Sequence, residues 1–180
     1  MRFTALLALI GVVGMGSGAR VAAQTDSAGI RAFSRNSAQQ LAEDPLELKS
    51  WYPSLQEYLA FVDGSYASGL SGLSEEKRAA KADELKQRAG KDYTRFRREY
   101  EQSCRDMADF LGDFLKEGYQ IEVLAASGQP DAEDKSVYRM VCTLSLVHTE
   151  DRQVLRLGYL AINTPSGWRV LDGFFENPRS

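Results

Sequence analysis

Residues 136–175, SVYRMVCTLSLVHTEDRQVLRLGYLAINTPSGWRVLDGFF, decide the fold. They hold three runs rich in apolar and β-branched residues, separated by Thr149–Arg152 and Asn163–Gly167, which have the composition of turns. A fourth run, over residues 119–123, alternates apolar and polar side chains with the period of a strand. Because short loops join antiparallel neighbours, residues 119–176 predict a four-stranded antiparallel meander.

The register of this sheet can be tested on the sequence. With Glu150 and Asp151 at the tip of the second hairpin, apolar residues pair on one face, which is the expected core face: Leu146–Leu155, Leu144–Leu157, Cys142–Tyr159 and Met140–Ala161. With Asn163 opposite Trp168, the same face continues through three further pairs: Ala161–Val170, Tyr159–Asp172 and Leu157–Phe174.

Helices are expected before the sheet. Ser54 and Glu57 have the spacing of a capping box, which predicts a helix start. Ser74 can cap a second, long helix that ends at Gly118, with a break or bend at Gly90. The later half of this helix carries a stripe at steps of three or four residues that predicts a buried face: Tyr93, Phe96, Tyr100, Cys104, Met107, Leu111 and Phe114.

The N-terminus has the pattern of a signal peptide. Arg2 precedes an apolar run of 13 residues, Phe3–Met15, which is shorter than the roughly 20 residues of a membrane span. Val21-Ala22-Ala23 fits a cleavage site, so the mature chain is expected to begin at Gln24. The alternative, an uncleaved anchor, is disfavoured because Arg20 and several glycines interrupt the apolar stretch. We therefore expect a secreted or periplasmic protein with no membrane span in the mature chain.

Three segments follow from these patterns. Residues 1–23 form the signal peptide, and residues 24–49 are expected to be poorly ordered. Residues 50–180 form a single α+β domain, with helices over 54–117 packed in a cone-like arrangement on the sheet over 119–176.

Composition excludes several functional classes. The chain has 180 residues, with 22 basic and 25 acidic side chains and a net charge of −3, which is too balanced for nucleic-acid binding. One histidine and two cysteines cannot form the usual zinc sites, and no metal site is expected. The sequence lacks a phosphate loop, a dinucleotide fingerprint and a nucleophile elbow, so no cofactor is expected.

Export favours a disulfide between Cys104 and Cys142; the alternative is two buried free thiols.

Two sets of residues are candidates for binding. On the expected core face, an inner pocket is predicted to be lined by four residues: Tyr138, Tyr159, Trp168 and Asp172. Asp172 with Tyr159 and His148 could support acid–base chemistry, although structural hydrogen bonding is the simpler interpretation. The opposite face carries four apolar residues that predict a protein interface, unless the chain's own helices cover them: Val141, Leu160, Leu171 and Phe175.

The last strand also carries a family resemblance. Gly167-Trp168-Arg169-Val170-Leu171-Asp172-Gly173-Phe174, preceded by helices and a meander, resembles the nuclear transport factor 2-like superfamily. That resemblance implies a curved sheet wrapped around helices, a conical pocket and, in many members, dimerisation through the sheet. The stretch from Gly158 to Phe175 also resembles periplasmic phospholipid-shuttle proteins, which hold acyl chains between sheet and helices.

These observations favour an exported, non-enzymatic binding or protein-interaction module. Its partner would be another protein or a second copy, bound through the sheet. The alternative is a periplasmic carrier of a lipid or other apolar small ligand, held between helices and sheet.

Overall fold

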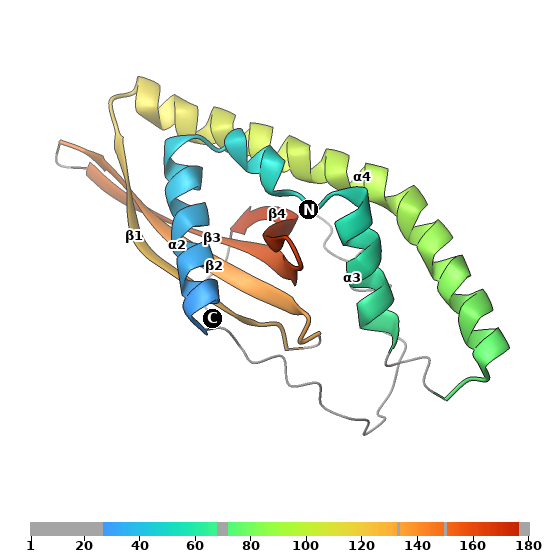
Figure 1. Cartoon of the computed structure of the whole chain (residues 1–180). Coiled ribbons are helices and arrows are strands. Elements are labelled where there is room, and N and C mark those ends of the chain that lie inside the picture. Colours follow the sequence, from blue (N-terminus) through green and yellow to red (C-terminus); the bar gives the residue numbers. More distant parts are fainter. Residues whose placement is uncertain (1–26, 68–71, 133, 150, 177–180) are drawn as a thin grey trace.

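The computed structural model describes four segments of the chain: residues 27–67, 72–132, 134–149 and 151–176. Helices come first and a four-stranded antiparallel sheet follows, which confirms the predicted α+β class (Figure 1). The elements are α2 (Ser27–Glu43), the 3-10 helix η1 (Glu47–Trp51), α3 (Leu55–Ala67), α4 (Glu75–Lys116), β1 (Gln120–Pro130), β2 (Val137–His148), β3 (Asp151–Thr164) and β4 (Gly167–Glu176). The predicted signal peptide lies outside the described residues.

The strands are ordered β1-β2-β3-β4, so the sheet is the predicted meander. The predicted β2–β3 register is wrong by two residues, because pairing continues to His148 opposite Asp151 and the turn is tighter than expected. Leu144 therefore lies opposite Leu155, and Cys142 opposite Leu157. A shift of two residues keeps every side chain on its face, and the predicted core face of β2 is buried.

The β3–β4 register is confirmed only at its start. Asn163 pairs with Trp168, but farther along β4 the register shifts, so that Asp172 lies opposite Leu160 and not Tyr159. The cause is two extra residues in β4, one on each side of Asp172, which oppose none in β3 and break the period of two on which the prediction relied.

The expectation that residues 24–49 are poorly ordered is wrong for the described part of that segment. α2 packs across β1 and β2 (Figure 1) and buries a helical stripe: Ile30, Phe33, Ser34, Ser37, Ala38 and Leu41. The packing is close, because a side chain at Gly128 of β1 would overlap Met140 and Ile30. The stripe lacks a clear hydrophobic pattern because two of its positions are serine.

α3 begins with the predicted capping box. The backbone N–H of Ser54 donates to Glu57 Oε2 (2.8 Å), and the backbone N–H of Glu57 donates to Ser54 Oγ (3.2 Å). Glu57 also pairs with Arg169 (2.9 Å) and accepts a hydrogen bond from Thr164 (3.2 Å). This glutamate therefore both caps α3 and ties it to the end of the sheet.

α4 is one continuous helix, so the break that was one of the two expectations for Gly90 does not occur. A glycine costs a helix only about 1 kcal/mol, and the flanking Ala89 and Tyr93 are buried in the core. The predicted end is confirmed: Gly118 has φ +89°, which glycine adopts easily. The predicted stripe faces the core, with Met107 and Phe114 only partly buried.

Candidate functional site

The predicted inner pocket is divided between two parts of the core. Tyr138 and Trp168 lie edge to face, with ring centroids 4.8 Å apart. Phe33 of α2 stacks on Trp168 at 5.5 Å and contacts Trp51 of η1 at 5.6 Å. These four aromatic side chains close the end of the core at which β4 begins.

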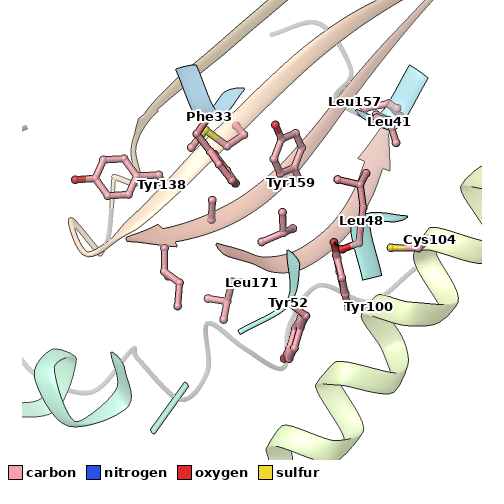
Figure 2. Close-up of a cluster of buried hydrophobic side chains, with 14 of the residues drawn as sticks. Phe33, Leu41, Leu48, Tyr52, Tyr100, Cys104, Tyr138, Leu157, Tyr159 and Leu171 are labelled. Carbon is pink, nitrogen blue, oxygen red and sulfur yellow. Dashed lines mark hydrogen bonds between the residues drawn. The ribbon is translucent and has the colours of Figure 1, made fainter. Parts of the chain in front are cut away.

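Tyr159 lies deeper in the core. Its hydroxyl hydrogen-bonds to that of Ser37 in α2, and its ring packs against Phe174 at 5.6 Å. Figure 2 shows Tyr159 among the buried side chains with Phe33 and Tyr138. Because large side chains from the helices fill the space over these residues, they act here as core residues.

Asp172 lies near Tyr52, a residue that the sequence analysis missed. Tyr52 is only 6% exposed, stacks on Tyr100 at 5.1 Å, and its hydroxyl has no hydrogen-bond partner among the described residues. Asp172 is partly buried and accepts a hydrogen bond from the backbone N–H of Gly173 (2.7 Å). Burial raises the pKa of Asp172, and the negative charge of Glu99 adds to this effect. Tyr52 follows a 3-10 helix, where no periodicity signals a core position.

The hypothetical acid–base set of His148, Tyr159 and Asp172 is not assembled. His148 is exposed at the tip of the β2–β3 hairpin, with its ring 5.1 Å from that of Tyr119. Tyr159 pairs with Met140, which is about 26 Å from His148 along β2 at the usual rise per residue. The described residues also include no group of three histidine, cysteine or carboxylate side chains that could hold a metal ion.

Cys104 and Cys142 are both buried and free, so the predicted disulfide is wrong. α4 packs against β4 and η1, whereas Cys142 lies in β2, two strands and about 10 Å from β4. Burial raises the pKa of Cys104 to about 11 and that of Cys142 to about 12. Both thiols are therefore expected to be unreactive in the folded protein.

The four predicted interface residues do not form one exposed patch. Leu171 is 3% exposed and belongs to the buried cluster that also contains Tyr52 (Figure 2). Val141 and Leu160 are partly exposed. The backbone of Phe175 lies in β4, but its side chain lies outside the described residues.

α3 covers one end of this outer face. Ser65 of α3 hydrogen-bonds to Ser136 at the start of β2 (3.2 Å), and Val137 and Ile162 nearby are buried. Farther along β2 and β3, Ser145 is buried, but the other outward side chains are at least partly exposed, and Val154 is 58% exposed. We call this region the open face; its residues are Val141, Thr143, Val147, Val154, Arg156 and Leu160.

Comparison with protein-family models, with curated proteins and with solved structures finds no match to this chain. The family resemblance therefore rests on the residues of the last strands alone. Within the described residues, no helix is long and apolar enough to cross a membrane.

Proposed function

We propose that this chain is an exported, non-enzymatic module that binds another protein through the open face of its sheet. The observation that carries the proposal is the exposure of Val154 in the interior of a long strand. A solvated sheet face normally alternates polar residues with the buried apolar ones of the other face. Here valines at positions 141, 147 and 154 point to the outer side together.

The charges of the open face indicate the kind of partner. Arg156 is exposed and forms no ion pair within the described part of the chain. Arg152, on the other side of Val154 along the same face of β3, donates a hydrogen bond to Ser145 (2.9 Å). Arginine beside apolar side chains is common at protein interfaces. A fitting partner therefore presents an apolar segment flanked by carboxylates.

The packing of the core supports surface binding over the carrier alternative. The side chains between helices and sheet include Leu41, Leu48, Met140 and Tyr159, each at most 1% exposed. A lipid held there would have to displace them. Native mass spectrometry tests this alternative: an added mass of several hundred daltons on the monomer would support a carrier.

Export is the part of the proposal that rests on the sequence pattern of residues 1–23. Fractionation of cells that express the full chain, with mass determination of the product, tests it. A product that begins at Gln24 in the exported fraction is expected.

Site-specific photo-crosslinking tests the open face. A photoreactive amino acid at position 154 should form one discrete crosslinked product in cells. In a separate variant without the photoreactive residue, Val154→Glu/Arg156→Glu should remove binding of the crosslinked partner in a pull-down. The matched control is a photoreactive amino acid at Leu46, another exposed apolar position (43%), with Leu46→Glu as the control substitution. Equal crosslinking from both positions, or unchanged binding by V154E/R156E, would contradict the proposal.

A further inference from the structure

A stripe of exposed side chains runs along the solvent side of α4. Its members recur at steps of three or four residues, so they share one helix face, and all are exposed: Lys91, Arg95, Arg98, Gln102, Asp106, Asp109 and Asp113. In Figure 1, α4 runs along one side of the molecule, and the other elements lie on its inner side. No described element covers the stripe.

The charges on this stripe are segregated and symmetric. Three basic residues precede Gln102 and three acidic residues follow it, and the steps outward from Gln102 are four, three and four residues in both directions. Like charges at these spacings destabilise a single helix, whereas alternating charges would stabilise it. Local contacts compensate only in part: Asp92 pairs with Arg95 (2.9 Å) and Lys116 with Asp113 (2.9 Å).

Four charged members of the stripe form no ion pair with any described residue: Lys91, Arg98, Asp106 and Asp109. The arrangement therefore leaves both signs of charge available to a partner surface. That surface must carry the same pattern in the reverse direction.

We propose that α4 of a second copy is this partner, and that two copies pair antiparallel around a twofold axis at Gln102. Antiparallel alignment brings opposite charges together in each half of the contact: Lys91 with Asp113, Arg95 with Asp109, and Arg98 with Asp106 of the second copy. By symmetry each pair occurs twice. Parallel alignment would oppose like charges, so the pattern specifies the orientation.

The charge complementarity between the two helices ends on both sides of the stripe. The next pair outward would place Arg88 opposite Lys116 of the second copy, and these residues carry the same charge. The complementary part therefore extends from Lys91 to Asp113. This stretch is about 33 Å long. Exposed ion pairs contribute little individually and are screened by salt. The pairing is therefore expected to be weak and strongly salt-dependent, with charge setting its orientation more than its affinity.

Sedimentation velocity of the purified full chain is the first test. At about 0.05 M salt, dimers should appear as the protein concentration rises toward about 0.5 mM, and about 0.5 M salt should weaken the association about tenfold or more. A monomer at every concentration at low salt would overturn the proposal. Association that strengthens with salt would also overturn it, because that response indicates an apolar contact.

Charge exchange gives the sharper test. The variants K91E/R95E/R98E and D106K/D109K/D113K each make all six cross-pairs repulsive in their own dimer, so each alone should be monomeric. Mixed together, they restore six attractive pairs and should form a 1:1 heterodimer. Circular dichroism and thermal unfolding establish that each variant is folded.

The control variant E43K/D83K/E122K carries the same change in charge as the second variant but alters exposed carboxylates outside the stripe. It should dimerise like the parent chain. Failure of the two folded variants to form a heterodimer, or persistent dimers of either variant alone, would overturn the proposal. The open face is unchanged in all these variants, so the result is independent of the proposed function.

Discussion

Asp172 is a carboxyl group in an environment that favours its neutral form. It is partly buried near Tyr52 and Glu99, and its one hydrogen bond within the described residues comes from the adjacent backbone N–H of Gly173. No described cation pairs with it. Such a group reduces stability when it ionises, because the unfolded chain solvates the carboxylate better.

Asp172→Asn should therefore stabilise the protein at neutral pH. The raised pKa means that the folded state releases the proton at higher pH than the unfolded state, so the stability contribution of Asp172 falls as pH rises above about 3.9. The asparagine oxygen can keep the hydrogen bond to Gly173. We expect a gain of order 1 kcal/mol in the free energy of unfolding at pH 7 and a smaller gain at pH 4.

Urea unfolding of both proteins at the two pH values measures this difference. Asp106→Asn, at an exposed position of α4, is the matched control and should show little change. A loss of stability for Asp172→Asn at pH 7 would mean that the ionised carboxylate has a stabilising partner, contrary to this account.

At the scale of elements, Glu57 connects helix and sheet. The backbone N–H of Ser54, together with the guanidinium of Arg169, holds the pKa of Glu57 at about 2. Because the folded pKa is lowered, the stabilisation is complete above the unfolded value of about 4.3 and is lost as pH falls toward 2. Glu57→Gln should cost about 2 kcal/mol at pH 7 and much less near pH 2.

Acid and urea titrations of E57Q and the parent chain test this coupling between α3 and the sheet. Glu122→Gln, an exposed glutamate of β1, serves as the control. A cost for E57Q that stays constant from pH 7 to pH 2 would show that the carboxylate charge contributes nothing to the cap or the ion pair.

The elements also show what the sequence can and cannot predict. The stripe of α4 and the meander were predicted because long runs of apolar residues keep one period. The irregular register of β4 was not predicted, because one extra residue before Asp172 and another after it shift the side chains of β4 relative to those of β3. α2 was not predicted as a packed helix because Ser37 occupies a core position: its hydroxyl donates to Phe33 O (2.8 Å), which satisfies the polar group without a hydrophobic signal.

The candidate site was also predicted only in part, because its residues come from several strands whose register the sequence does not fix. Tyr138 of β2 and Trp168 of β4 do meet, across the intervening strand β3, but Asp172 does not lie opposite Tyr159 because that pairing depended on the register past the bulge. The open face follows from α3 covering only one end of the sheet. Helix placement on a sheet face depends on contacts distant in sequence, which local patterns do not report.

For the whole molecule, the decisive point is that α2 shares one core with the sheet and α4. Leu41 is fully buried in a cluster that also contains Met140 and Tyr100. If this core is a single cooperative unit, Leu41→Ala should cost about 2–5 kcal/mol in the free energy of unfolding, as for other buried leucines. Fluorescence and circular dichroism should then report one coincident urea transition.

Leu46→Ala, at the exposed position just beyond α2, should change the stability by less than about 0.5 kcal/mol. An Leu41→Ala variant with parent-like stability would mean that α2 is an appendage, as the composition of residues 24–49 suggested. Two separate transitions would mean that α2 and the sheet unfold independently. A single, strongly shifted transition would make the segment after the predicted signal peptide part of the fold itself, so that any processing beyond Ser27 would remove core residues.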